Sequence, residues 1–478
     1  MRKIFNVALV MLALAFSACT DLEIQPLSST TSDVVFTDEE SYRRFIARVY
    51  AGLAVTGQQG PAGNADISSL DEGFSNYLRQ YWQLQELPTG EAVISWGDDG
   101  LQPLNIQSWT SENQFVNAMY YRIFFQVSIA NEFLRESTDA KLDSRGIRPG
   151  VRSEIDTYRA EARFLRAFSY WHGIDLFGDI PFYTEEQEIG SAAPQQASRA
   201  DVFNFLIEEL NAIESQLPDP GAGEYARVDK AAVWMLQAKL FLNAEVYAGV
   251  NRYNECIEVC NKIISSNAYS LTPNYEHLFL ADNHTSEEII WAIAFDGDNT
   301  QTWGGMTYMT HAPVGGSMPP EQFGINGGWS GVRTTAALVD LFPDENGDLD
   351  KRAMFWTDGQ SKEISNLTDF TNGYAITKWK NVTSEGIRGS NVQHIDTDYP
   401  MFRFGEVHLL YAEATLRGGN GDINTAVDYI NALRRRAYGN DNGAITANDL
   451  TLDFILDERS RELYWEATRR TDLIRFGV

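Results

Sequence analysis

Three tryptophans are notable for the small and polar residues around them: Trp96 in ISWGDD, Trp303 in QTWGGM and Trp329 in NGGWSG. Leaving so large an apolar side chain in water forgoes about 1.5–3 kcal/mol of burial free energy. That is a large share of a total stability of about 5–15 kcal/mol, so exposure of several tryptophans implies a use. A sugar ring supplies one, because its C–H face packs on an aromatic plane while its hydroxyls take polar partners at the edge.

Polar side chains that could serve such a ring lie in the same parts of the chain. Arg79, Asp99 and Asn326 are close in sequence to the three tryptophans or belong to the same Gly-rich blocks. Composition alone still favours the alternative that each tryptophan is an ordinary core residue. The pattern therefore raises a sugar platform as a hypothesis and leaves a buried aromatic core beside it.

Catalytic chemistry has weak support. The chain contains no GxGxxG after a strand, no P-loop, no HExxH and no GxSxG, and its six histidines lie in no triad-like context. Glycoside hydrolysis needs two carboxylates that face one bond. Asp98–Asp99, Glu321 and Asp71–Glu72 are candidates, but acidic residues are so abundant here that chance supplies such pairs. We therefore predict a protein that is not an enzyme and that needs no cofactor.

Metal and thiol chemistry is equally unsupported. The stretch DENGDLD, Asp344 to Asp350, has the alternating oxygens of a calcium loop, but its glycine is at the fourth position and not the sixth. A solvated turn is the preferred interpretation, with calcium as the alternative. Cys256 and Cys260 lie four residues apart in a helical pattern, which does not suit a disulfide, and no histidine pair accompanies them for zinc. We expect both to be small buried residues.

Bulk composition excludes some partners. The 478 residues carry a formal net charge of −28, which opposes binding to nucleic acid and to anionic lipid headgroups. The first residues predict export: Arg2 and Lys3 precede the apolar run 4–16, and Ser17 and Ala18 precede Cys19 as in a lipobox. We expect residues 1–18 to be a lipoprotein signal peptide and Cys19 to be lipidated, with an ordinary signal-peptidase site as the rival. No other stretch is long and apolar enough to cross a bilayer.

The elements that must position these residues are mostly helices. Apolar residues recur at spacings of three and four in several segments, and capping residues such as Ser198 and Asp229 precede two of them. The segments with this pattern are 155–177, 199–217, 230–248, 257–264, 407–417 and 426–433. Helices in pairs joined by short turns, rich in Ala and Tyr, predict a mainly α fold with tetratricopeptide-like stacking.

Two blocks interrupt the helical pattern, at about 57–115 and 296–400. Both are rich in Gly, Asn, Asp and Thr, and together they hold seven of the eleven tryptophans. We predict one domain over residues 19–478, with a helical scaffold mainly at 116–295 and 401–478. The two blocks should form a large irregular region that binds the ligand, because long loops on a rigid frame commonly carry binding residues.

Four long segments resemble the SusD/RagB family in order and spacing. They are EARFLRAFSYWHGIDLFGDIPF (161–182), DKAAVWMLQAKLFLNAEVY (229–247), FRFGEVHLLYAEA (402–414) and ERSRELYWEATRRTDLIRFG (458–477). The resemblance covers essentially the whole mature chain. It implies a glycan-binding lipoprotein, anchored in the outer membrane and exposed at the cell surface. It also implies a SusC-like, TonB-dependent outer-membrane transporter as the partner that receives the glycan.

A narrower resemblance, to starch-binding members of this family, implies the site. It rests on AVTGQQG (54–60), the stretch 71–96, WGGMTY (303–308) and NGGWSG (326–331). By motif, Trp96 and Trp329 would be two walls of an aromatic arc around a curved α-glucan. Trp303 stands where those proteins have a tyrosine, and Arg79 would donate hydrogen bonds to sugar hydroxyls. Asp99 stands where they have an asparagine, which keeps an acceptor and loses a donor.

Several alternatives remain at the level of the sequence. The same protein could capture a flat β-glucan or a fructan, which a coplanar set of tryptophans would favour. It could also be a transporter-interaction protein without a sugar site of its own, or, least supported, a hydrolase. Family members continue beyond the position of Val478 with an aromatic stretch and a Pro-rich tail, so we expect this sequence to be a fragment of a longer chain.

Overall fold

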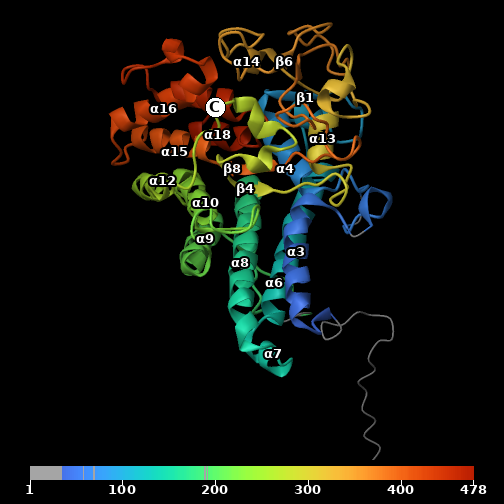
Figure 1. Ribbon diagram of the computed structural model, residues 1–478, viewed down its shortest axis with the longest axis vertical. Coiled ribbons are helices and arrows are strands. Elements are labelled where there is room, and N and C mark those ends of the chain that lie inside the picture. The colour runs from blue at the N-terminus through green and yellow to red at the C-terminus, as the bar shows by residue number, and fades with distance from the viewer. Residues whose placement is uncertain (1–34, 58, 68–69, 188–189, 191) are drawn as a thin grey trace, which may run out of the picture.

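The computed structural model describes residues 35–478 apart from 58, 68–69, 188–189 and 191 (Figure 1). The expected signal segment and Cys19 therefore lie outside the described residues. The helices are α3 (Glu39–Ala54), α4 (Tyr77–Glu86), α5 (Gln102–Asn105), α6 (Gln114–Glu136), α7 (Asp139–Ser144), α8 (Pro149–Phe177), α9 (Arg199–Ile213), α10 (Lys230–Leu242), α11 (Ala244–Ala248), α12 (Tyr253–Ser266), α13 (Gly305–His311), α14 (Ala336–Val339), α15 (Phe404–Leu416), α16 (Ile423–Tyr438), α17 (Leu452–Leu463) and α18 (Arg469–Phe476). Within this part of the chain, none of them has the length and apolar character to cross a membrane.

The mainly α fold predicted from the sequence is confirmed, and so are several helix ends. Ser198 caps α9 by accepting a hydrogen bond from the backbone N–H of Asp201, and Asp229 caps α10 through Ala232. Gly178, at a φ of 77°, ends α8. The pattern at 230–248 predicts one helix, but the structure has two, α10 and α11. They part at Asn243, whose side chain donates to the carbonyl of Lys239 and accepts from Arg475.

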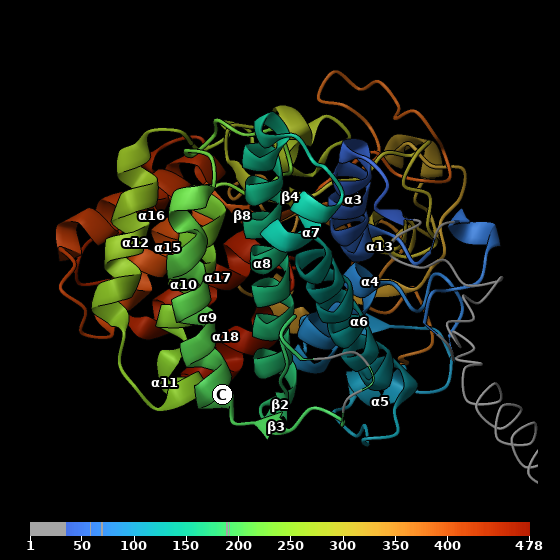
Figure 2. The same ribbon diagram turned by 90° about the horizontal axis from the view of Figure 1, so that it is seen from below.

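The helices lie side by side in a curved layer. Figure 2 shows them ranged from α16, α15 and α12 through α10 and α8 to α6 and α3. Neighbours in this layer are also in contact, among them α6 with α8, α10 with α12, and α15 with α16. Cys256 and Cys260, on α12, are buried in this layer as free thiols, as expected.

The two Gly-rich blocks meet at one end of the helical layer, where β1, α13, β6 and α14 gather in Figure 1. The strands are short: β1 (Ala92–Ile94), β2 (Ile180–Pro181), β3 (Gln196–Ala197), β4 (Ile289–Ile293), β5 (Val332–Thr334), β6 (Phe355–Trp356), β7 (Ala375–Ile376) and β8 (Tyr399–Arg403). They form the antiparallel pairs β1–β5, β2–β3, β4–β8 and β6–β7. Because β1 belongs to the first block and β5 to the second, their pairing joins segments about 240 residues apart.

The first block also contains a helix that its sequence does not predict. All ten residues of α4 are buried, including Gln80, Gln83 and Gln85. This helix is short and lies in a block that is otherwise rich in Gly, Asn, Asp and Thr, so the sequence alone assigns it to the irregular region. Asn76 begins α4 by accepting the backbone N–H of Arg79.

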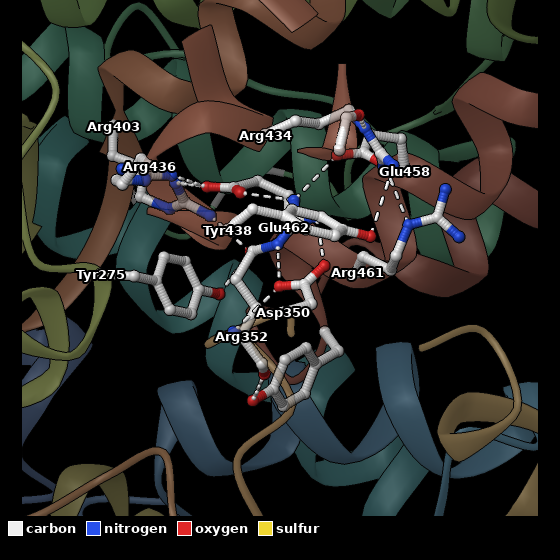
Figure 3. Close-up of polar contacts among 12 residues, drawn as sticks. Tyr275, Asp350, Arg352, Arg403, Arg434, Arg436, Tyr438, Glu458, Arg461 and Glu462 are labelled. Atoms are coloured by element: carbon white, nitrogen blue, oxygen red, sulfur yellow. Dashed lines mark hydrogen bonds and ion pairs between the residues drawn. The ribbon is translucent and has the colours of Figure 1, made fainter. Parts of the chain in front are cut away.

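Buried ion pairs connect the helical layer to the second block (Figure 3). Glu462 on α17 accepts hydrogen bonds from Arg352 at 3.0 Å, from Arg403 at 2.7 Å and from Arg436. Arg352 also pairs with Asp350 and with Glu458, at 2.7 and 2.9 Å. Asp350 is the last residue of the stretch DENGDLD, for which the sequence predicts a solvated turn. Asp348 and Leu349 are exposed, as that prediction requires, but Asp350 is buried. The Asp344 carboxylate accepts backbone N–H groups of its own turn.

These charges remain ionised because each has opposite charges around it. Burial alone would raise the pKa of Glu462, but Arg436, Arg403 and Arg352 together hold that pKa well below its usual range. Burial opposes ionisation at Glu458 as well, yet its three arginine neighbours lower the pKa to about 2. Removing one partner would leave buried charge uncompensated, which is far more costly than loss of an exposed pair.

The variant Glu462→Gln should therefore lower the free energy of unfolding by about 3–5 kcal/mol, because three guanidinium groups lose their shared carboxylate. Urea denaturation at pH 7 measures this. Asp441→Asn is the matched control, since Asp441 pairs with Arg435 at 2.7 Å but is largely exposed, and it should leave the unfolding free energy nearly unchanged.

The pKa values of Glu458 and Glu462 are lower in the folded chain than in the unfolded chain. The stability that these two carboxylates contribute is therefore complete above their ordinary pKa of about 4.3 and is lost as pH falls towards 2. The difference between wild type and Glu462→Gln should narrow over that range. Equal stability of the two proteins at pH 7 would contradict this account of the network.

Candidate functional site

The three tryptophans singled out in the sequence come together where β1 ends and β5 begins. Trp96 follows β1, Trp329 precedes β5, and Trp303 precedes α13. The ring centroids of Trp96 and Trp329 lie 6.2 Å apart with their planes at 44°, and those of Trp303 and Trp329 lie 6.2 Å apart at 53°. All three rings are half-buried. Successive planes are thus strongly inclined, and the set is not coplanar.

The β1–β5 ladder continues into this cluster and fixes Trp96 against the NGGWSG loop. Ser95 donates from its backbone to the carbonyl of Gly331 at 2.8 Å and from its hydroxyl to the carbonyl of Ser330 at 2.7 Å. The indole N–H of Trp96 then donates to the carbonyl of Trp329 at 3.1 Å. Trp96 therefore has its only hydrogen-bond donor engaged, and its ring offers a face and not an edge donor to a ligand.

The glycines of NGGWSG allow close approach of the backbone. A Cβ on Gly331 would meet the Trp96 ring at 2.5 Å, and one on Gly328 would meet the carbonyl oxygen of Val314 at 2.1 Å. The loop is also tightly bonded to the end of α13: Trp329 N–H donates to His311 O at 2.9 Å, and Gly331 N–H donates to Ala312 O at 2.7 Å. Trp329 thus stands on a fixed loop.

Arg79, on α4, packs against the aromatic cluster and lacks hydrogen-bond partners for part of its guanidinium group. Its guanidinium carbon is 4.1 Å from the centre of the Phe74 ring, 4.2 Å from that of Tyr308 and 5.7 Å from that of Trp96. Its Nε and Nη2 are buried and have no hydrogen-bond partner among the described residues. Burial lowers the pKa of Arg79 to about 10, so it is protonated at neutral pH. A buried charged donor without an acceptor is costly, and a ligand hydroxyl would satisfy it.

Trp303 is held by two residues of the loop before α4. The Glu72 carboxylate accepts the Trp303 backbone N–H at 2.8 Å and the Thr56 hydroxyl at 2.7 Å. Asn76, the cap of α4, also accepts the Gly305 N–H at 3.0 Å and donates to the carbonyl of Ala54 at 2.7 Å. The same short segment therefore orients both Arg79 and Trp303.

Together these groups enclose an open cavity of about 630 Å³. Trp96, Trp303, Trp329 and Phe74 form its aromatic walls, and Asp71, Glu72 and Arg79 its charged lining. The remaining wall is formed by Pro61, Gly63, Asn64, Ala65, Leu70 and Gly73. An aromatic-walled cavity with a few convergent polar groups has the character of a small-molecule or oligosaccharide site.

Four of the five sequence-predicted binding residues line this cavity, and one does not. Asp99 lies on the exposed loop beyond Trp96, outside the cavity lining, and its backbone carbonyl accepts from Gln114. Asn326 is likewise exposed and outside the lining.

The structure adds residues that the sequence does not single out for binding. Phe74 and Asp71 belong to the stretch 71–96 that carries the family resemblance, so the signal for them was present. Tyr308 and His311 lie on α13 behind the rings. Tyr308 ends the stretch WGGMTY, so a signal for it was present, whereas His311 belongs to no distinguishing motif because its role depends on where the NGGWSG loop folds back.

Catalytic and metal-binding arrangements find no support among these side chains. Asp71 and Glu72 are the carboxylates of the cavity lining, and both oxygens of Glu72 already accept hydrogen bonds from Thr56 and Trp303. Across the described ranges, no cluster of three or more His, Cys, Asp or Glu side chains could hold a metal ion.

Comparisons of the sequence with a family model and with known proteins agree on one family. The model of the SusD family matches residues 356–478. The starch-binding protein SusD of Bacteroides thetaiotaomicron is 33% identical over an alignment of 527 residues, which covers 100% of this chain and 90% of that protein. The SusD-like protein P2 of Formosa agariphila is 24% identical over 505 residues, covering 100% and 91% of the two chains.

Solved structures share the fold at lower identity. A SusD superfamily protein from Bacteroides thetaiotaomicron matches with a TM-score of 0.69 at 16% identity, over 92% of this chain and 89% of that one. Surface glycan-binding protein A from the same species, solved with laminarihexaose, matches with a TM-score of 0.68 at 21% identity, over 92% and 91%.

The glycine contacts in the NGGWSG loop make a direct prediction. Gly331→Ala should lower the free energy of unfolding by about 1–3 kcal/mol and displace the Trp96 ring, because the new methyl group overlaps it. Urea denaturation and near-UV circular dichroism measure the two effects. Gly327→Ala is the matched control, since nothing lies within 4 Å of its added Cβ. Similar behaviour of both variants would show that the loop does not pack on Trp96 as described.

Proposed function

This chain belongs to the SusD family, and from that premise we propose that it is a cell-surface lipoprotein that captures starch and malto-oligosaccharides and passes them to a TonB-dependent outer-membrane transporter. Proteins of this family bind carbohydrate and are not catalysts, so the chain is not an enzyme. The cavity between β1, α4 and α13 is the site to which we assign the glycan.

The observation that carries the proposal is the inclination of the three indole planes, 44° between Trp96 and Trp329 and 53° between Trp303 and Trp329. Coplanar rings would suit a flat, extended glycan. Rings turned in succession can each meet a different sugar of a chain that curves, as an α-glucan does. Apolar stacking of this kind adds to affinity at each ring, while polar groups at the edge select the hydroxyl pattern.

Polar groups around the rings complete the proposed site. Arg79 has two buried nitrogens, Nε and Nη2, without partners among the described residues, and we assign them as donors to sugar hydroxyls. Asp71 lies in the lining with an exposed carboxylate that can accept. Asp99 is outside the cavity lining, so we assign it only to a glycan that extends beyond the cavity.

Two relatives point to different sugars. A relative at 33% identity over the full chain is named for binding starch, which supports the α-glucan. A fold neighbour at 21% identity was solved with laminarihexaose, a β-linked glucan, so a β-glucan is the second candidate. Lipidation of Cys19, the outer-membrane location and the SusC-like transporter follow from the lipobox and from family membership, and they are part of the proposal.

Affinity electrophoresis tests the site. The mature protein should be retarded in gels that contain soluble starch and not in gels that contain β-glucan or levan. Trp96→Ala and Trp329→Ala should abolish retardation, because each removes one wall of the cavity. Trp109→Ala is the matched control: Trp109 is 38% exposed on the loop after α5 but is not part of the cavity lining, and its loss should leave retardation unchanged. Retardation by β-glucan alone would favour the second candidate, and unchanged retardation of both cavity variants would exclude this site.

Arg79 provides a separate test, because binding and stability should respond differently. Arg79→Met should weaken starch binding at least tenfold, a loss of about 1.4 kcal/mol or more expected for a charged hydrogen bond. Its unfolding free energy should stay within about 1 kcal/mol of wild type, since the variant removes a buried charge that has no ion pair in the described structure. Calorimetric titration and urea denaturation measure the two quantities. Unchanged binding would remove Arg79 from the site.

A further inference from the structure

One face of Trp329 is covered by a histidine. The His311 ring lies 4.9 Å from the Trp329 ring, centre to centre, with the planes at 22°, and only 1% of His311 is exposed. Trp329 lines the cavity, whereas His311 does not. The imidazole therefore backs the indole from the protein side, and only the opposite face of Trp329 can meet a ligand.

His311 also holds the backbone that carries Trp329. Its carbonyl accepts the Trp329 N–H at 2.9 Å, and its Nδ1 lies 2.7 Å from the carbonyl oxygen of Gly327. Its Nε2 lies 3.1 Å from the carbonyl oxygen of Gln393, in a separate loop. A single residue thus contacts the NGGWSG loop at the ring, at the main chain before it, and at the main chain of the tryptophan itself.

The contact with Gln393 extends this support to a second wall of the cavity. The next residue, His394, packs against Trp303 at 5.1 Å, and its Nδ1 lies 3.2 Å from the carbonyl oxygen of Thr302. Two adjacent residues of one loop therefore connect the back of Trp329 with the back of Trp303. The angle between these two indoles is the quantity on which the proposed choice of a curved glycan depends.

We propose that His311 is a positioning residue that sets the angle of Trp329 to Trp303, through its ring and its two contacts with main-chain carbonyl groups. This rests on the proposed function of the cavity as a glycan site. His311 touches no ligand in this account and acts through Trp329.

Both ring nitrogens of His311 face carbonyl oxygens, Nδ1 that of Gly327 and Nε2 that of Gln393. Burial lowers the pKa of His311, and these two carbonyl groups act in the opposite direction. The positioning role therefore rests on the ring contact and on the two main-chain contacts, which join the NGGWSG loop to the loop that carries Gln393.

Two variants of His311 separate a positioning role from a general loss of packing. His311→Ala removes the ring and both hydrogen-bonding atoms. His311→Gln lacks the ring but keeps a side-chain N–H group that can donate to one of the two carbonyl oxygens. His408→Ala is the matched control, because His408 is also buried and stacked on an aromatic ring, Tyr429, at 4.7 Å, but lies on α15 away from the cavity.

We expect His311→Ala to bind maltoheptaose about threefold to tenfold more weakly at pH 7.5, the range that loss of an aromatic contact produces. His311→Gln should restore part of this binding, and His408→Ala should bind as wild type does. Calorimetric titration measures all four proteins.

Acrylamide quenching of tryptophan fluorescence tests the same role without any glycan. The signal of Trp329, taken as the difference from Trp329→Phe in each background, should become more accessible in His311→Ala and stay protected in His311→Gln. If wild type binds no glycan, the proposed function fails while this comparison still decides the positioning role. The inference is overturned if Trp329 is equally protected in His311→Ala, or if His408→Ala weakens glycan binding as much as His311→Ala does.

Discussion

Buried arginine–carboxylate pairing is the constraint on which the rest of the molecule depends. Glu462 is surrounded by Arg352, Arg403 and Arg436, which come from a loop, a strand and a helix far apart in sequence. Such charges are tolerated in the interior only when every partner is in place. The segment after α17 then continues to the cavity: the carbonyl of Trp465 accepts the indole N–H of Trp82 at 3.1 Å, and Trp82 packs on Tyr308. The network thereby fixes α4 and α13, the two helices that carry Arg79 and Tyr308.

The result is a binding surface that is formed before the ligand arrives. Each indole has a rigid support on its protein side: Gly331 lies on Trp96, His311 lies behind Trp329, and the Glu72 carboxylate holds the backbone of Trp303. A site whose side chains are already ordered loses less entropy on binding, so more of the stacking free energy contributes to affinity. Among the described residues of the cavity lining, only Arg79 has buried side-chain hydrogen-bond donors without an acceptor.

The sequence predicts the helical layer well and the cavity only in part. Apolar residues at spacings of three and four, with the capping residues Ser198 and Asp229, identify α8, α9 and α10. The same reasoning misses α4, a short helix within a block that is otherwise irregular, and misses the break at Asn243. Trp96, Trp303 and Trp329 are found through their Gly-rich surroundings and the family resemblance. His311 is not, because its contacts with Trp329 form only where the NGGWSG loop returns to α13. Asp99 is predicted from the resemblance, and its exposed loop places it outside the lining.

The central claim is that the inclined tryptophan rings make the site bind a curved glycan more tightly than a flat one. Calorimetric titration with three glucose hexasaccharides that differ only in linkage, namely maltohexaose, cellohexaose and laminarihexaose, tests it most directly. The account predicts that maltohexaose binds at least tenfold more tightly than cellohexaose, a difference of about 1.4 kcal/mol or more. Equal affinities, or a preference for the flat cellohexaose, would contradict it.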